Sequence, residues 1–154
     1  MIISRTSQYA VQAMIYMATQ PPLTPVLNKD VAATLNIPAP YLSKILQVLA
    51  KGNLLYSFRG RTGGFYLRED GGNINLMEII EQTEGPNFTK NCLLGLKRCS
   101  EETACPLHAQ WLPVKDKVIG LLKQTTLTEL ARAVESGKYR LADLPGEVYA
   151  RVPS

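Results

Sequence analysis

Cysteine and histidine are scarce in this chain of 154 residues, which contains three cysteines and one histidine. All four fall within the segment 92–108. An odd number of cysteines does not support a disulfide framework, so metal binding or thiol chemistry is the better explanation for them. The segment also lacks a C-x2-C pair, which is the usual spacing of thiolates in a structural zinc site.

Long apolar runs are also missing. The N-terminal stretch 1–20 is interrupted by polar residues and is too short to span a bilayer. It lacks the basic start and the small-residue cleavage site of an export signal. We therefore expect a cytoplasmic protein that does not bind membranes. Its composition, 45% hydrophobic and 19% charged, is typical of one globular domain with a short appendage.

Acidic residues are nearly absent from residues 1–68, which carry seven basic side chains and one acid, Asp30, and so have a net charge of +6. Residues 69–154 carry ten basic and twelve acidic side chains, for a net charge of −2. A basic half joined to a slightly acidic half predicts contact with a polyanion, and nucleic acid is the one expected in the cytoplasm. A merely solvated basic surface is the alternative that the charges alone leave open.

Apolar periodicity predicts three helices before residue 53. The first follows a possible N-cap at Ser4 and ends before "QPPLTP". The second, "LNKDVAATLNI", is expected to be capped by Asn28, and the third ends at Gly52. The tight link "NIP" between the second and third is typical of a helix-turn-helix, whose second helix enters the major groove of DNA. The residues expected to face DNA from this pair are Lys29, Pro40, Tyr41, Ser43, Lys44 and Gln47.

Two β-prone runs flank "GRTGG" and predict a hairpin whose turn uses glycine at positions of positive φ. Arg59 and Arg61 lie at its tip, as expected of a wing that meets the minor groove or flanking phosphates. Each element alone has an ordinary structural explanation, but their order favours DNA binding. The predicted fold class is mainly α: a winged helix-turn-helix domain with a β-hairpin wing, plus a long dimerisation helix.

From residue 1 to about residue 136 the chain resembles the family of winged helix-turn-helix regulators that includes IscR and NsrR, bacterial sensors that carry an iron–sulfur cluster. The resemblance rests on the three-cysteine segment and on "SQYAVQAMIYMA", "IPAPYLSKILQVLAKGNLL", "RGRTGGFYL", "INLMEIIEQTEG" and "VIGLLKQTTLTELA". It implies a homodimer that binds a double-stranded DNA operator. It also implies that a long helix after the cysteines holds the dimer, with each cluster loop near the partner's DNA-binding domain.

The cysteines follow the spacing Cys-x6-Cys-x5-Cys, and Cys-x2-His comes next. Thiolates are soft ligands that suit iron–sulfur clusters and zinc, so Cys92, Cys99 and Cys105 are the candidate ligands. The resemblance to IscR-type members implies His108 as the fourth ligand of a [2Fe–2S] cluster. That cluster is favoured over [4Fe–4S] because Gln8 stands where NsrR-type members have an aspartate, although the first interval is six residues where the commoner pattern has five. A structural zinc site and purely reactive thiols are the alternatives.

An apolar stripe follows the cysteines and predicts either a dimer seam or packing within the subunit. Its helix either starts near Pro106 and kinks at Pro113 or starts at Pro113 itself. A further helix is expected from a cap at Thr126 to Gly137. The residues of the stripe, taken as candidates for dimerisation, are Trp111, Val114, Val118, Leu121 and Leu122.

These expectations divide the chain into a DNA-binding domain (1–84), a cluster-binding loop (85–110), the dimerisation helix with the helix after it (111–136) and a tail (137–154). The predicted function is a non-enzymatic transcription regulator that senses iron–sulfur status, redox state or nitric oxide. The alternatives are a winged-helix protein with a structural zinc site and a purely thiol-based redox regulator. No nucleotide-binding loop and no C-x2-C pair supports an enzyme.

Overall fold

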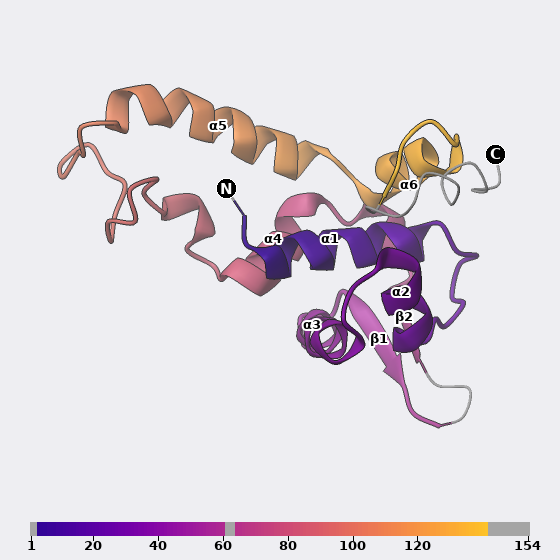
Figure 1. The fold of residues 1–154 in the computed structure, drawn as a ribbon. Helices are drawn as coiled ribbons and strands as arrows, with labels where there is room; N and C mark the ends of the chain where they lie inside the picture. The colour runs from indigo at the N-terminus through magenta and orange to yellow at the C-terminus, as the bar shows by residue number, and fades with distance from the viewer. Residues whose placement is uncertain (1–2, 61–63, 142–154) are drawn as a thin grey trace.

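A computed structural model describes residues 3–60 and 64–141 (Figure 1). It is mainly helical, with one antiparallel hairpin in which Leu55 pairs with Leu67 and Phe58 with Gly64. The predicted fold class is therefore confirmed. The elements are α1 (Arg5–Ala18), α2 (Asn28–Leu35), α3 (Ala39–Lys51), β1 (Leu55–Phe58), β2 (Gly64–Leu67), η1 (Gly71–Asn73), α4 (Leu76–Glu84), η2 (Phe88–Lys90), α5 (His108–Gln124) and α6 (Leu127–Glu135).

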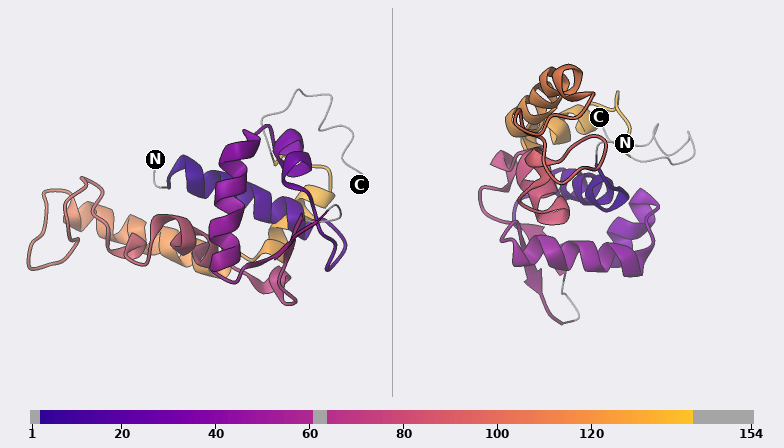
Figure 2. Two further views of the ribbon diagram at one scale, coloured as in Figure 1. Left: turned by 90° about the horizontal axis from the view of Figure 1, so that it is seen from below. Right: turned by 90° about the vertical axis from the view of Figure 1, so that its left-hand side faces the viewer.

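The elements lie in three levels, which Figures 1 and 2 show from perpendicular directions. α1 and α4 form the middle level, α2, α3 and the hairpin lie on one side of it, and α5 and α6 lie on the other. α5 and the segment 85–107 project from this body as an arm. Across residues 3–60 and 64–141, no helix combines the length and apolar character needed to cross a bilayer.

The main core surrounds α1, whose Ala10, Ala13 and Met14 have no exposed surface. α3 packs against it through the apolar face that its sequence predicts, which consists of Leu42, Ile45, Leu46 and Leu49, all 2% exposed or less. A smaller cluster of Met77, Ile80 and Leu122 joins α4 to α5. Burial of this size is the main stabilising term in a small domain. The main core holds α3, the second helix of the helix-turn-helix and hence the recognition helix, on one side of the middle level. The smaller cluster holds α5, and with it the cysteine-containing arm, on the other side.

The predicted helix ends are partly right. The hydroxyl of Ser4 accepts from the backbone amide of Ser7 and caps α1, and Gly52 is the C-cap of α3. The cap predicted at Asn28 is wrong, because Leu27 occupies the N-cap and Asn28 is the first helical residue. The side-chain amide of Asn28 instead donates a hydrogen bond of 2.9 Å to the carbonyl oxygen of Ala39. This bond joins the start of α2 to the start of α3.

The hairpin is fixed to the body at its base. The backbones of Val26 and Phe65 exchange two hydrogen bonds of 2.8 and 2.9 Å, so the loop before α2 lies against β2. Gly64 allows this approach, because a Cβ atom there would meet the carbonyl oxygen of Val26 at 2.4 Å. Gly60, near the tip, has a φ of 109°, as the turn prediction requires. The wing and the helix-turn-helix are therefore one unit.

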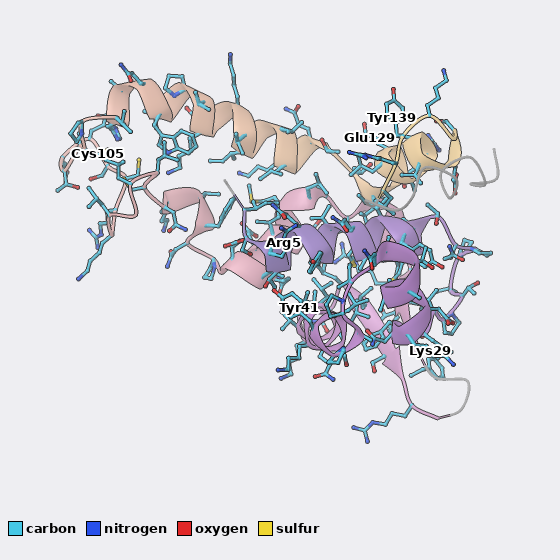
Figure 3. The ribbon with its side chains drawn as sticks, in the orientation of Figure 1. Arg5, Lys29, Tyr41, Cys105, Glu129 and Tyr139 are labelled. Atoms are coloured by element: carbon cyan, nitrogen blue, oxygen red, sulfur yellow. The ribbon has the colours of Figure 1, made fainter. Side chains whose placement is uncertain are left out.

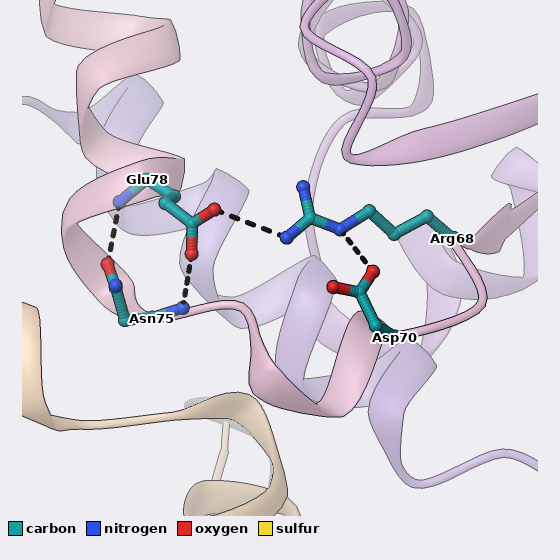
Figure 4. Close-up of polar contacts among 4 residues, drawn as sticks. All are labelled: Arg68, Asp70, Asn75 and Glu78. Carbon is teal, nitrogen blue, oxygen red and sulfur yellow. Dashed lines mark hydrogen bonds and ion pairs between the residues drawn. The ribbon is translucent and has the colours of Figure 1, made fainter.

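Arg68 at the end of β2 is held by two carboxylates (Figure 4). Its guanidinium lies 2.7 Å from Asp70 and 3.2 Å from Glu78. Glu78 also forms a capping box with Asn75 at the start of α4, where each side chain bonds to the other's backbone amide. Arg68 therefore ties the wing to α4, and its charge is less available to a nucleic acid than that of an unpaired arginine.

α5 begins at His108 and runs through Pro113, so the second predicted starting point, at Pro113, is wrong. Proline lacks the backbone N–H that would bond to the preceding turn, but one missing bond in a helix of 17 residues does not end it here. The helix predicted after Thr126 is confirmed. Thr126 caps α6 through a capping box with Glu129, and Gly137 follows the helix with a φ of 76°.

Candidate nucleic-acid interface and metal centre

The outer face of α3 carries polar side chains above the buried leucine face. Pro40, Lys44 and Gln47 are exposed and Ser43 is half-buried. Lys29, in the first turn of α2, is also exposed and lies on the same side of the molecule as α3 (Figure 3). The five side chains are thus accessible to solvent on the helix-turn-helix, and their contact with a major groove stays a prediction.

Tyr41 lies differently from the other candidates on α3. It is half-buried, its ring packs edge-on against Tyr9 at a centroid distance of 5.7 Å, and its hydroxyl is hydrogen-bonded to that of Thr6. The guanidinium of Arg5 in turn lies 5.7 Å from the ring of Tyr9. Tyr41 thus connects the start of the recognition helix to α1, and its role as a DNA contact stays a prediction.

The wing presents a mixed surface. Arg59 is exposed, as predicted, whereas Arg61 lies outside the described residues. Phe58 is 53% exposed and packs beside Tyr66, which also contacts Tyr56. Aromatic pairs of this kind stiffen a two-stranded hairpin.

The cysteine segment is closed by backbone hydrogen bonds rather than by regular structure. The backbone amide of Cys99 donates to the carbonyl oxygen of Lys90 over 3.2 Å, and the backbone amide of His108 donates to the carbonyl oxygen of Cys105 over 3.0 Å. Between Lys90 and Cys99, Gly95 has a φ of 78°, which lets the chain turn back after Cys92. Figure 3 shows Cys105 at the far end of the arm.

The four candidate ligands lie in two pairs. The sulfurs of Cys92 and Cys105 are 3.9 Å apart, and the sulfur of Cys99 is 3.5 Å from Nδ1 of His108. Cys92 and His108 are both buried, and Nε2 of His108 has no hydrogen-bond partner. Within the described part of the chain, no three Cys, His, Asp or Glu side chains converge on one point that could hold a single metal ion.

The environment of Cys92 favours the thiolate. Backbone amides of Leu94 and Leu96, the neighbouring Cys105 thiol and the positive charge of Lys115 lower the pKa of the Cys92 thiol, with the Leu94 amide contributing most, against the opposing effect of burial. A lowered pKa is a property expected of a metal-binding cysteine. Sequence reasoning missed Lys115. Its place on the helix that directly follows the cysteines was a signal that its charge could lie near them.

The predicted dimerisation stripe divides into two parts. Leu122 is only 7% exposed because it packs against Met77 and Ile80 of α4. Val118 and Trp111 are half-buried, and Val118 packs against the same cluster. Val114 and Leu121 are 48% and 61% exposed. Packing within the subunit therefore explains Leu122 and Val118. The dimer seam stays a prediction, for which Val114 and Leu121 are the exposed candidates.

A polar joint, which sequence reasoning missed, connects α1 to the end of α4. Ser7 is fully buried, and its hydroxyl lies 2.6 Å from both the hydroxyl of Thr83 and Oε1 of Glu84. Glu84 also accepts from the backbone amide of Ser4 over 2.7 Å. Because Ser7 is three residues before the buried Ala10, its helical spacing could have revealed that it faces inward.

Comparisons with known proteins agree with this arrangement. A sequence model of the Rrf2 family, described as an iron-dependent transcriptional regulator, matches residues 3–133. An HTH-type transcriptional regulator of Aquifex aeolicus (strain VF5) is 33% identical over 144 residues, which cover 88% of this chain and 94% of that one. The HTH-type transcriptional regulator IscR of Salmonella newport (strain SL254) is 31% identical over 149 residues, which cover 94% and 90%.

Two solved structures are similar over most of their length. CymR (YrzC), the global cysteine regulator of B. subtilis, superposes with a TM-score of 0.71 at 28% identity and covers 85% of this chain and 96% of its own. IscR of T. potens superposes with a TM-score of 0.68 at 26% identity and covers 96% and 95%. Fold and relatives together define a winged-helix transcription regulator and not an enzyme. The chain belongs to the Rrf2 family, as its resemblance to IscR and NsrR predicts.

The polar joint leads to a prediction about acid stability. Burial acts to raise the pKa of Glu84, but hydrogen bonds from the side chains of Ser4 and Ser7 and from the Ser4 amide outweigh it and lower the pKa below the ordinary value of 4.5. A lowered carboxylate pKa stabilises the folded state above about pH 4.5, and this contribution is lost as the pH falls through the lower, folded-state value.

Glu84→Gln should therefore lower the free energy of unfolding of the metal-free protein at pH 7 by about 1 kcal/mol. The difference from the wild type should shrink as the pH falls below about 4.5. Urea titrations at several pH values would measure it, and Glu81→Gln, on the same helix, is the matched control. A difference that does not change with pH would show that the charge of Glu84 contributes nothing.

Proposed function

We propose that this protein is a homodimeric, cytoplasmic transcription regulator that binds a double-stranded DNA operator and senses iron–sulfur status, redox state or nitric oxide through a [2Fe–2S] cluster. The ligands would be Cys92, Cys99, Cys105 and His108. The observation that carries the proposal is the arrangement of these four donors in two pairs. When bound, the cluster would supply a labile, redox-active group whose state a signal can change.

The distances within each pair match those that a tetrahedral ion would impose, and among the described residues no three of these donors converge on one point. A tetrahedral ion with bonds of about 2.3 Å to sulfur holds two thiolates about 3.8 Å apart, and with a bond of about 2.1 Å to nitrogen it holds a thiolate and an imidazole about 3.6 Å apart. The observed separations are 3.9 Å between the sulfurs of Cys92 and Cys105 and 3.5 Å between Cys99 and His108. A two-iron cluster takes two protein ligands on each iron, whereas structural zinc needs all four around one point.

A DNA interface is supported by the exposed polar face of α3 and by the wing. Lys44 and Gln47 are exposed on the helix, and Arg59 is exposed on the hairpin. The backbone bridge from Val26 to Phe65 holds these two surfaces in one unit. Because the first 68 residues carry a net charge of +6, long-range attraction to phosphates would add to the specific contacts.

α1 offers a route by which the cysteine segment could act on the recognition helix of the same chain. Glu84 is the last residue of α4 and directly precedes the segment 85–107, which contains the cysteines. Its carboxylate accepts hydrogen bonds from Ser4 and Ser7. Thr6, next to Ser7 in the same turn of α1, and Tyr9 contact Tyr41 of α3. A rearrangement of the segment would therefore alter the support of both helices, and couplings of this kind are typically ~1–3 kcal/mol.

A purely thiol-based regulator is the second candidate. The 3.9 Å between the sulfurs of Cys92 and Cys105 is short enough that a small movement would allow a disulfide, in which the two thiols lose two protons and two electrons to an oxidant. One similar solved structure is an oxidised form of CymR from Staphylococcus aureus, with a TM-score of 0.65 and 28% identity. Such a protein would be colourless.

Anaerobic reconstitution with iron and sulfide is the experiment that distinguishes these functions. The wild type should gain visible absorbance together with equal amounts of iron and acid-labile sulfide. Each Cys→Ala variant should lose the chromophore, and His108→Ala should keep a less stable one, because three thiolates remain and water can take the fourth position. Ser100→Ala, in the same segment, is the control that should keep the chromophore. A colourless wild type would overturn the cluster and favour zinc or thiol chemistry.

DNA binding should depend on α3 and the wing. Lys44→Ala and Arg59→Ala should each weaken binding by about 1–3 kcal/mol if the side chain reads a base, and by less if it meets only phosphate. Fluorescence anisotropy at fixed salt, with a site selected from a random-sequence pool, would measure this. Lys123→Ala, on the exposed surface of α5, should leave the affinity unchanged. Unchanged affinity in the double variant of Lys44 and Arg59 would rule out this interface.

The exposed part of the stripe on α5 is the proposed dimer seam. Leu121→Asp or Val114→Asp would place a charge in a dry interface, where an unpaired ion costs several kcal/mol, so the variants should be monomers. Neither side chain belongs to the hydrophobic cluster that Met77 and Ile80 form with Leu122, so the subunit should stay folded. Sedimentation velocity would measure the mass, with Lys123→Asp as the control. A dimer that persists in both apolar-to-charge variants would exclude this seam.

A further inference from the structure

Lys115 is buried to an extent that is unusual for lysine. It lies in the second turn of α5 and only 8% of its surface is exposed, whereas lysine is almost never buried without an ionic partner. Among the described residues, no carboxylate lies within ion-pair distance of the Lys115 ammonium group. An ammonium group that is removed from water in this way needs an anion or polar contacts to offset the lost hydration.

The contacts of Lys115 lead to the cysteine segment. Its Nζ donates a hydrogen bond of 3.3 Å to the carbonyl oxygen of Asn91, the residue before Cys92. The side chain also lines a cavity of about 200 Å³ together with Cys92. The cavity has polar lining residues, Glu84, Thr89 and Asn91, and apolar ones, which include Trp111 and Val118.

The net charge of the site explains why a cation would be placed there. Three thiolates outnumber the positive charge of an oxidised two-iron, two-sulfide core, so a loaded site is anionic when the histidine is neutral. Adding one electron makes it more negative still. A fixed positive charge nearby therefore stabilises the reduced cluster more than the oxidised one, and this raises the reduction potential.

We propose that Lys115 is a positioning residue of the cysteine site, which holds the backbone next to Cys92 and supplies the positive charge that balances the cluster. This inference rests on the proposed function for its second part only. The hydrogen bond to Asn91 exists without any cluster, so the anchoring part can be tested in the metal-free protein.

The charge is tested by a potentiometric titration of the reconstituted wild type and of Lys115→Met, in which a mediator-coupled reductant supplies the single electron. Lys115→Met keeps the apolar stem and removes the charge. It should destabilise the reduced cluster relative to the oxidised one about tenfold, which lowers the potential by about 59 mV for a one-electron couple. Lys115→Arg should stay near the wild type, and Lys117→Met, an exposed position two residues away, is the matched control. Equal potentials in the wild type and Lys115→Met would overturn the charge-balancing role.

The anchor is tested by hydrogen exchange in the metal-free protein. Lys115→Met should speed exchange of the Cys99 amide, whose bond to the carbonyl oxygen of Lys90 closes the segment that Asn91 begins. Lys115→Gln, which keeps a donor without the charge, should exchange more slowly than Lys115→Met and serves as the second variant if the methionine variant does not fold. Unchanged exchange in Lys115→Met would overturn the anchoring role. If the wild type binds no cluster, both the proposed function and the charge-balancing role of Lys115 are refuted. The exchange rates in the metal-free protein would still test whether Lys115 anchors the backbone at Asn91.

Discussion

Burial of one face of α1 is the constraint on which the remaining structure depends. Ala10 and Ala13 have small side chains and no exposed surface, so other elements approach the backbone of this helix closely. The recognition helix packs on one side of α1, and α4 and α6 pack on other sides (Figures 1 and 2). Both α3 and the start of the projecting segment 85–107 are therefore positioned by a single helix.

Much of the fold could be predicted because it follows from periodicity and from residues with narrow backbone preferences. The leucine face of α3 is a local pattern and was right, and Gly60 has the positive φ that the turn prediction requires, whereas residues 61–63 of the turn lie outside the described part of the chain. Asn28 was wrong because capping was judged from neighbouring residues alone, whereas its amide bonds to Ala39, eleven positions later. The division of the stripe between Leu122 and Leu121 could not be predicted, because it depends on where α4 lies.

The candidate site could be predicted by residue type but not by geometry. Three cysteines and one histidine in a single segment indicate metal or thiol chemistry whatever the fold. Their pairing, Cys92 with Cys105 and Cys99 with His108, depends on an irregular backbone that no periodic pattern describes. Lys115 was missed for a related reason: a lysine on a helix is ordinarily solvated, and only the return of the chain past Asn91 removes it from water.

The backbone bridge between Val26 and Phe65 bears on how such a protein can change its target sequence over evolution. Two backbone hydrogen bonds hold the base of the wing to the loop before α2, so the spacing between the wing and the helix-turn-helix is inherited with the fold. New specificity must then come from exchange of side chains such as Gln47, or from a longer or shorter wing tip beyond Phe58. Related regulators with this bridge should diverge in the bases they prefer much faster than in the spacing of their binding sites.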